Sequence, residues 1–540
     1  MSYDVDVVVA GGGPVGLMLA CELRLGGASV VVLERLTEVD PTIKAGALNT
    51  PSVEALYRRG LLPGLQKAQE ENLERFAAFM RQRLPEGEPA KAPPRFAGHF
   101  AGITLSADRL DPSDPDLNGH GPADLVGMVG QQQLEVLLAE RAADLGAEVR
   151  RGVELTGFEA DDDGVTVATG GGPIRGRWLV GCDGGRSTVR KLAGFDFPGT
   201  GPEITAHQAM VEMEGAEALG AGWHATPTGV YAHGPMPGRI LTVEFGGTPV
   251  GRDTPVGRDT PVGRDTPVGR DTPVTADELQ ASIRNVSGAD VVVTGVKTAT
   301  RFTDNARQAT TYRLGRVLLA GDAAHVHSPF GGQGLNLGLG DAVNLGWKLA
   351  ATVRGWAPEG LLDTYTAERH PIGAWVLDWT RAQIALMRPD PHARALREVV
   401  TQLTETVAGT THFVKKISGV WQRYDLPGDH PLVGGSAPDL ELADGSRLAD
   451  HLHGGGALLL DPAGELRVLV SGYGDRLRVV AEAVPGRAGL AGLLVRPDGV
   501  VAWAADTGQV DPGALEAALS AWLGAPAVAG AGAPVARASA

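Results

Sequence analysis

The stretch of sequence that decides the fold is DVDVVVAGGGPVG at residues 4–16. Its first half is an apolar run typical of a central parallel strand, and its second half carries the pattern G-x-G-x-x-G at Gly11, Gly13 and Gly16. An apolar helix at 17–25 and a second strand at 29–33 follow, and that strand ends on Glu34. This order of elements predicts the βαβ unit of a dinucleotide-binding domain, and with it an α/β fold.

Each residue type in this unit suits one part of a dinucleotide. The glycines permit a tight turn and a close approach of the pyrophosphate, and Pro14 and Val15 open the helix whose N-terminus supplies positive partial charge. Glu34 lies about 20 positions beyond the glycines, where an acidic residue accepts hydrogen bonds from a ribose. Arg35 either pairs with a phosphate or is solvated.

A second glycine-rich stretch, GDAAHVHSPFGGQGLN at residues 321–336, lies between an expected strand at 316–320 and an expected helix at 337–351. Asp322, at the carboxyl end of the strand, can accept hydrogen bonds from sugar-type hydroxyls. The glycines after Pro329, including Gly332 and Gly334, let the backbone pass close to a flat ligand. Free N–H groups near Leu335 and Asn336 would stabilise negative charge above them. An ordinary turn from Gly321 into a core helix is the alternative interpretation, and the N-terminal motif makes a ligand site the favoured one.

Three further segments hold candidate ligand-binding residues. In GCDGGRSTVR at 181–190, a strand ends on the glycine-flanked Asp183, and two arginines nearby could meet a phosphate. A small-residue loop carries Lys44 and Ala45; the lysine either reaches a flat ring or lies at the surface. Gln131 opens an expected helix at 132–145, where it either bonds a cofactor or provides simple N-terminal polarity.

The net charge and the cysteine count limit which ligands and partners the protein can bind. The chain has 540 residues and a net charge of -16, which argues against nucleic acid or an anionic membrane as a partner. Two cysteines are too few for a disulfide framework or a metal site, so no metal is expected. The chain lacks a long uncharged apolar run, and its N-terminus lacks a basic region before the first apolar segment. We therefore expect a cytoplasmic protein, either a monomer or a homodimer.

The middle of the chain has a sequence pattern typical of β-strands. Expected strands at 148–154, 157–168 and 174–180 resemble a β-meander, and longer alternating segments from 195 to 245 predict an antiparallel sheet that walls a binding cavity. His224, Tyr231 and His233 on this sheet are weak candidates for a catalytic base, since such residues on a sheet more often pack or face solvent. Residues 368–371 are expected to cap the region after the glycine-rich stretch, before covering helices at 374–387 and 394–406.

The last part forms an independent αβ pattern. Strands are expected at 457–460, 466–469, 478–480 and 492–495, with a helix at 512–522. We therefore predict three domains and a tail. These are a dinucleotide-binding domain (1–75, 103–192 and 301–375), a substrate domain (76–102 and 193–300, with covering helices 376–420), a C-terminal domain (425–525) and a disordered tail (526–540).

With these three motifs in place, the chain resembles the class A flavoprotein monooxygenases of the para-hydroxybenzoate and phenol hydroxylase type, and among them the aromatic polyketide hydroxylases and rifampicin monooxygenases. The resemblance covers nearly the whole chain. It implies bound FAD, with Asp322 on the ribityl chain, backbone from Pro329 to Asn336 along the isoalloxazine, and Gln131 on the cofactor. It also implies a thioredoxin-like C-terminal domain, which here lacks Cys-x-x-Cys, so a redox role is not expected.

The resemblance further implies a reaction. NADPH, more than NADH, would bind transiently and reduce the FAD, and O2 would give a C4a-hydroperoxide that hydroxylates a polycyclic aromatic polyketide. Two alternatives stay open: Baeyer–Villiger insertion of oxygen beside a ketone by the same flavin, and a non-catalytic protein that binds FAD or another ligand.

Four identical copies of GRDTPV occupy residues 251–274. A proline in every six residues forbids helix and weakens any central strand, and one valine per unit cannot build a stacked core. We therefore interpret the repeat as an exposed excursion without a catalytic role. Deleting residues 251–274 should leave NADPH oxidation within about a few-fold of wild type, and a collapse of activity would contradict this interpretation.

Overall fold

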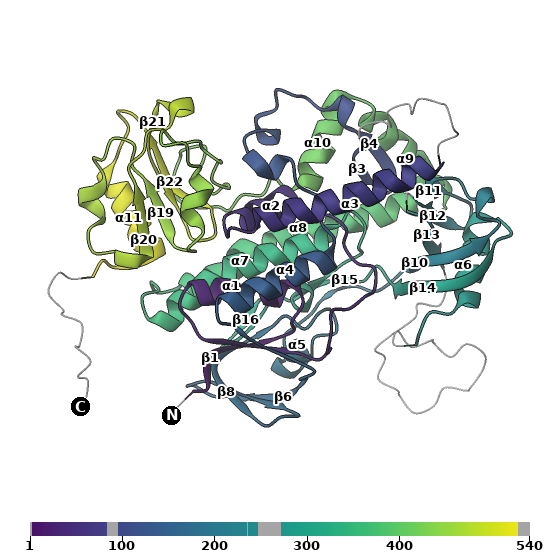
Figure 1. Ribbon diagram of the computed structural model, residues 1–540, viewed down its shortest axis with the longest axis horizontal. Coiled ribbons are helices and arrows are strands. Elements are labelled where there is room, and N and C mark those ends of the chain that lie inside the picture. Colours follow the sequence, from purple (N-terminus) through teal and green to yellow (C-terminus); the bar gives the residue numbers. More distant parts are fainter. Residues whose placement is uncertain (1–2, 84–95, 235, 247–271, 528–540) are drawn as a thin grey trace.

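The computed structural model describes residues 3–83, 96–234, 236–246 and 272–527 (Figure 1). Most of the hexad repeat and the tail from residue 528 onward lie outside these ranges, so the predictions made for them are untested. No helix in the described ranges is both long enough and apolar enough to cross a bilayer.

The largest sheet is parallel through its centre (Figure 1). Its parallel strands lie side by side in the order β17 (Val317–Leu319), β8 (Ile174–Gly181), β1 (Val5–Ala10), β2 (Val30–Glu34) and β5 (Glu148–Arg151). Antiparallel strands β6 (Leu155–Ala160) and β7 (Val165–Thr169) extend it as a meander beside β8, and β16 (Arg313–Leu314) pairs with β17. The predicted parallel sheet with a β-meander is therefore confirmed.

Helices cover this sheet closely. The central one, α1 (Pro14–Leu25), contacts α4 (Gln131–Asp144) and α7 (Gln333–Arg354). A Cβ at Gly346 of α7 would lie 2.3 Å from the Cβ of Glu22, so this glycine permits the close crossing of α1 and α7. Shorter or more peripheral helices are α2 (Thr50–Tyr57), α3 (Leu62–Arg83) and α5 (Thr188–Ala193).

The middle of the chain forms the predicted antiparallel sheet. Its strands, in spatial order, are β11 (Gly222–Ala225), β12 (Gly229–His233), β13 (Arg239–Phe245), β10 (Ile204–Glu214) and β14 (Val292–Phe302). One face packs on α6 (Ala276–Ser287) through a cluster that includes Ile283. The other face packs on α8 (Thr364–Met387), the hairpin β3 (Phe96–Phe100) and β4 (Ile103–Ser106), α9 (Pro391–Thr404) and α10 (Val407–Ser418). A separate small sheet consists of β9 (Gly199–Thr200), β15 (Ala306–Gln308) and β18 (His325–Val326).

The C-terminal part has its own mixed sheet, seen at the left of Figure 1. Its strand order is β20 (Leu477–Val480), β19 (Ala457–Leu460), β21 (Leu490–Val495) and β22 (Val501–Asp506), with α11 (Pro512–Leu523). β19 and β20 are parallel, whereas β21 and β22 form an antiparallel hairpin, as expected for a thioredoxin-like sheet. Trp347 and Ala351 of α7 belong to the core on one face of this sheet, so the C-terminal part packs directly on α7. The domain boundaries given above stay a prediction.

Several sequence-based expectations were wrong in detail. Residues 368–371 do not end a region, because α8 continues through Pro371, where Ile372 and Val376 pack on Leu337 and stabilise the helix despite the lost hydrogen bond. The expected strand at 466–469 is a 3-10 turn at Arg467–Val470, because the Asp461 carboxylate accepts hydrogen bonds from the backbone at 465–467 and turns the chain. The long helix α3 was not predicted.

Candidate functional site

Three adjacent parallel strands bring the three motifs to one edge of the large sheet. β1, β8 and β17 end at Ala10, Gly181 and Leu319 respectively. The N–H of Cys182 donates to the carbonyl of Ala10 at 2.7 Å, and the N–H of Ala320 donates to the carbonyl of Gly181 at 3.0 Å. Because the strands are parallel, the loops that follow them lie next to each other, which is the arrangement expected of a ligand site in an open α/β sheet.

The glycines of the first loop differ in what surrounds them. Gly11 has φ +107°, and a Cβ there would lie 2.3 Å from the carbonyl oxygen of Cys182. A Cβ at Gly16 would lie 2.0 Å from the carbonyl oxygen of Gly11. A Cβ at Gly13, by contrast, would meet nothing within 4 Å. Two glycines therefore permit the turn, and Gly13 leaves open space at the N-terminus of α1, where Pro14 is the first helical residue.

The N-terminal loop contacts the Gly-Asp loop, which we define as residues 321–332. A Cβ at Gly321 would lie 3.1 Å from the side chain of Val15, and one at Gly338 would lie 2.6 Å from it. Val15 therefore fits between the start of the Gly-Asp loop and the second turn of α7. Although these segments are more than 300 positions apart in sequence, they form one surface.

Glu34 and Arg35 follow β2 at the same edge. Glu34 accepts hydrogen bonds from the N–H of Gly12 at 2.7 Å and from the N–H of Leu36 at 2.8 Å. These bonds orient the carboxylate beside the glycine turn. The Arg35 side chain is exposed.

Asp322 and His327 provide a test of whether the site suits a ligand with hydroxyl groups. Asp322 is exposed, so its carboxylate is open to solvent or to a ligand. His327 Nδ1 donates to the carbonyl of Ser328 at 2.7 Å, so Nε2 is an acceptor, and it is buried without a partner in the described ranges. Burial lowers the pKa of His327, which favours this neutral form.

Both acceptors lie close to Gly334, since a Cβ at Gly334 would be 3.5 Å from His327 Nε2 and 3.9 Å from Asp322 Oδ1. A polyhydroxylated chain, such as the ribityl chain of FAD, offers hydrogen-bond donors to both. His327 was not predicted from the sequence as a site residue.

Helix α7 begins close to this pair. It starts at Gln333, not at residue 337 as expected, with Gly332 as a left-handed N-cap at φ +64°. Gly332 and Pro329 are exposed, Leu335 is half-buried against the core, and no side chain caps the first turn. The first N–H groups of α7 are therefore available to a ligand with negative charge.

Other predicted cofactor contacts hold the loop at 44–49. The N–H of Gln131 donates to the carbonyl of Ala45 at 2.9 Å. Asn336 accepts from the N–H of Asn49 at 2.9 Å and donates to the carbonyl of Gly332 at 2.9 Å. Lys44 pairs with Asp40 at 2.8 Å. The structure therefore brings together several residues predicted to contact the cofactor. Their hydrogen bonds join the loop at 44–49 to α4 and α7.

Asp183 has one satisfied and one unsatisfied oxygen. Its Oδ2 accepts hydrogen bonds from the N–H groups of Thr188 at 2.7 Å and Val189 at 3.1 Å. Its Oδ1 is buried without a partner among the described residues. Arg190 donates to the carbonyls of Ala323 and Gly185, at 2.9 and 2.8 Å, and so joins this loop to the Gly-Asp loop.

An aromatic surface continues from the Gly-Asp loop. Phe330 lies with its ring centroid 5.9 Å from Phe302 and 6.2 Å from Trp223, both on the antiparallel sheet. Phe100 lies 4.5 Å from Trp379. Trp379 Nε1 is buried without a partner in the described part of the chain, and a Cβ at Gly331 would be 3.7 Å from it. Flat apolar walls and an unpaired donor beside a glycine-rich loop suit an aromatic ligand.

The weak catalytic candidates lie elsewhere. His224 and Tyr231 stack on each other at 4.8 Å, and Tyr231 belongs to the core that packs on α6. Neighbouring Trp223 contacts Phe330, and alternate residues of a strand face opposite ways. His224, Tyr231 and the buried His233 therefore lie on the face turned away from Phe330, and we assign no catalytic base to them.

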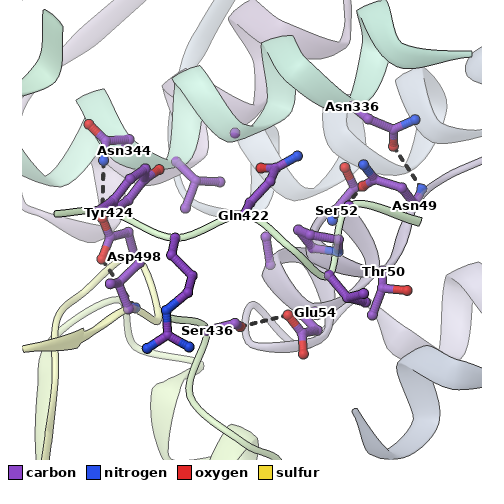
Figure 2. Close-up of a pocket in the computed structure, with 18 of the residues that line it drawn as sticks. Asn49, Thr50, Ser52, Glu54, Asn336, Asn344, Gln422, Tyr424, Ser436 and Asp498 are labelled. Atoms are coloured by element: carbon purple, nitrogen blue, oxygen red, sulfur yellow. Dashed lines mark hydrogen bonds between the residues drawn. The ribbon is translucent and has the colours of Figure 1, made fainter. Parts of the chain in front are cut away.

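A pocket of about 90 Å³ lies beside α7 (Figure 2). It is lined by residues of α2, α7, the linker at 419–424 and the C-terminal part, and Figure 2 shows Asn336 bonded to Asn49 on one side and Asn344 bonded to Asp498 on the other. At its border Glu54 accepts from the Ser436 hydroxyl at 2.6 Å and from His120 Nδ1 at 2.8 Å. The pocket therefore lies between the C-terminal part and α7, the helix that follows the Gly-Asp loop.

The His120–Glu54 pair predicts a pH dependence of stability. Burial alone would lower the pKa of His120, but the Glu54 carboxylate raises it to about 9, with Asp124 adding to this. Because the ordinary pKa is about 6.5, the stabilisation is complete below that pH and is lost as the pH rises to about 9. From pH 6.5 to 9.5 the free energy of unfolding should fall by about 2 kcal/mol more in wild type than in His120→Gln. Urea unfolding measures this, and parallel profiles for the two proteins would contradict it.

The strand-end loops, the open space at Gly13 and the acceptors of the Gly-Asp loop suit a dinucleotide, and an aromatic surface lies next to them. A model of an FAD binding domain matches residues 4–380, and a model of the aromatic-ring hydroxylase C-terminal domain matches residues 430–526. The chain belongs to the family of FAD-dependent aromatic-ring hydroxylases, as the sequence motifs indicated.

Relatives match over nearly the whole chain. Rifampicin monooxygenase from Streptomyces venezuelae is 42% identical over 522 residues, which cover 96% of this chain and 99% of that protein. The structure of the anhydrotetracycline hydroxylase OxyS from Streptomyces rimosus superposes with a TM-score of 0.80 at 40% identity, covering 97% of this chain and 100% of that one. A Diels-Alderase of pyrroindomycin biosynthesis superposes with a TM-score of 0.73 at 35% identity, covering 97% and 100%.

Proposed function

We propose that this protein is an NADPH-dependent flavin monooxygenase that hydroxylates a polycyclic aromatic polyketide. The observation that supports this most is the continuity of two surfaces through Phe330. On one side lies the Gly-Asp loop with its acceptors, and on the other lies the aromatic surface of the antiparallel sheet. A flat substrate bound on the aromatic surface would meet a flavin at that loop.

The chain's own residues would hold the cofactor by three means. Gly13 and the N-terminus of α1 would take the pyrophosphate, Asp322 and His327 the ribityl chain, and the first turn of α7 the electron-rich edge of the reduced ring. When bound and reduced, FAD would supply the activation of O2. The protein's part is to orient the substrate and exclude water, for which the packed ring walls are suited.

NADPH is proposed as a transient partner. The described chain has one G-x-G-x-x-G motif after a strand, and the FAD proposal uses it. The arginines near Asp183 would then bind a phosphate of NADPH or of FAD, and the unpaired Oδ1 of Asp183 would accept a hydrogen bond from a hydroxyl group of the bound nucleotide.

The test is oxidation of NADPH and NADH by the purified holoprotein across a panel of polycyclic polyketides, with product mass. The proposal expects substrate-dependent NADPH oxidation and a product heavier by one oxygen atom that keeps its carbonyl pattern. A lactone carbonyl in that product would instead favour Baeyer–Villiger insertion.

A non-oxidative role on bound FAD is the second candidate, because one structural relative is named as a Diels-Alderase and a further relative, 36% identical, as a dialkyldecalin synthase. A yellow protein that oxidises no NADPH with any substrate, and either forms an isomer of the substrate or leaves it unchanged, would replace the proposal by this one.

A further inference from the structure

Arg496 is a fully buried arginine of the C-terminal part, at its junction with α7 and α8. Its guanidinium donates to Glu368 of α8 at 2.8 and 2.7 Å and also pairs with Asp498. It lies 4.3 Å from the Trp522 ring and 5.4 Å from the Tyr424 ring. Burial opposes the charge of Glu368, but Arg496 and Lys348 lower the pKa of this carboxyl to about 2. The junction is therefore a buried network of ion pairs and hydrogen bonds.

A second set of bonds leads from the junction to the Gly-Asp loop. The Tyr424 hydroxyl accepts from Arg369 at 3.2 Å, and Arg369 Nε donates to Asp341 at 2.8 Å. The other oxygen of Asp341 accepts from the N–H of Gly321 at 3.0 Å and from His325 at 2.7 Å. Asp341 and Arg369 are buried, so each depends on the other for compensation of its charge.

These contacts form a path from Arg496 through Tyr424, Arg369 and Asp341 to Gly321. Close packing against α7 restricts the movement of its side chains. A Cβ at Gly340 of α7 would lie 2.6 Å from the Arg369 guanidinium, so Arg369 runs directly along the helix that starts at the Gly-Asp loop. Asn344 of α7 donates to Glu368 at 2.6 Å and to Asp498 at 3.3 Å, and Figure 2 shows the latter bond beside Tyr424. Both ends of the path are therefore fixed to α7.

We propose that the C-terminal part is a positioning element for the flavin site: Arg496 and Tyr424 hold Arg369 and Asp341, and Asp341 holds Gly321 in the conformation that presents Asp322. The proposal rests on the FAD binding assigned to the Gly-Asp loop. It gives this Cys-x-x-Cys-free domain a role other than redox chemistry, and it makes Arg496, about 170 positions from the loop, a determinant of FAD affinity.

The test measures the FAD dissociation constant, by fluorescence titration of apoprotein, in full-length variants. Tyr424→Phe keeps the ring and the Arg496–Glu368 pair but removes the acceptor of Arg369, and we expect about threefold weaker binding. Arg496→Met should weaken binding by about tenfold. Asp461→Asn is the matched control, because Asp461 is a buried acid of the same domain whose bonds stay within residues 465–467. It should lower the melting temperature of the domain but leave FAD affinity within about twofold. Combining Tyr424→Phe with Arg496→Met should give less than the product of the two effects, as expected for residues on one path.

Visible circular dichroism of the bound flavin supplies a readout that loss of stability alone would not change. Altered flavin bands in Tyr424→Phe, with an unchanged melting temperature of the apoprotein, support the proposal. Equal FAD affinity in wild type, Tyr424→Phe and Arg496→Met overturns it, as does an equal loss in Asp461→Asn. A wild-type protein that binds no FAD would overturn the proposed function instead, so the two failures are distinguishable.

Discussion

Asp322→Ala is expected to purify with clearly less FAD than wild type and to bind added FAD at least about five times more weakly. The exposed Asp322 carboxylate and the buried, unpaired Nε2 of His327 both lie close to Gly334, so a ribityl chain there would supply hydrogen-bond donors to both. Removing one acceptor strands the ligand hydroxyl that it served, at a cost of about 1–3 kcal/mol, or roughly a five- to hundredfold weaker complex. The ratio of flavin to protein absorbance after purification and a titration of the apoprotein measure the effect.

Two further variants complete this experiment. Asp322→Asn retains one acceptor oxygen and should lose less affinity than Asp322→Ala. Asp162→Ala, in the exposed turn between β6 and β7, removes a carboxylate of the same kind and should bind FAD as wild type does. Full flavin occupancy in Asp322→Ala would show that the ribityl assignment is wrong.

Gly13→Ala and Gly16→Ala are expected to fail in different ways. A Cβ at Gly16 would lie 2.0 Å from the carbonyl oxygen of Gly11, so α1 would have to move from β1 and the fold should be lost. A Cβ at Gly13 meets no protein atom within 4 Å, and the extended backbone there accepts alanine. Gly13→Ala should therefore fold as apoprotein yet bind FAD about tenfold more weakly or worse, because the added methyl occupies space meant for the pyrophosphate.

Two measurements on each of the two glycine variants distinguish loss of folding from loss of FAD binding. Circular dichroism with the melting temperature of the apoprotein reports folding, and flavin titration reports binding. We expect Gly13→Ala to change only the second, and Gly16→Ala to yield aggregated or unfolded protein. Unchanged FAD affinity in Gly13→Ala would place the dinucleotide elsewhere.

Local patterns identified most of the fold because they are tied to local physics. The glycine turn after β1, the acid at the end of β2 and the alternation in β10 to β13 depend on backbone sterics and burial, which a short window of sequence carries. The strands that end near residues 10 and 320 do reach the same edge of one sheet, because parallel strands place their carboxyl ends together. The strand expected at 466–469 was wrong because the Asp461 side chain, not strand propensity, sets the backbone there.

Side-chain roles were harder to predict. The cofactor contact expected of Asn336 stays a prediction, and the sequence did not reveal that the Asn336 side chain bonds to Asn49 and Gly332. His224 and Tyr231 could be assigned to a sheet, but which face they occupy depends on register, which is fixed by pairing with distant strands. His327 was missed because its unpaired nitrogen follows from a bond to Ser328 that sequence does not reveal, although the alternation His325-x-His327 was a usable signal. The path from Arg496 to Gly321 joins four remote segments, and no short window contains it.

The account depends most on one proposition, that the loops after β1 and β17 hold a single FAD between them. A crystal structure of the protein with FAD tests it most directly. We predict density for the pyrophosphate at Gly13, for the ribityl chain between Asp322 and His327, and for the ring along residues 329–335. Density at any other site, or a dinucleotide that contacts one of these loops and not the other, would contradict the account.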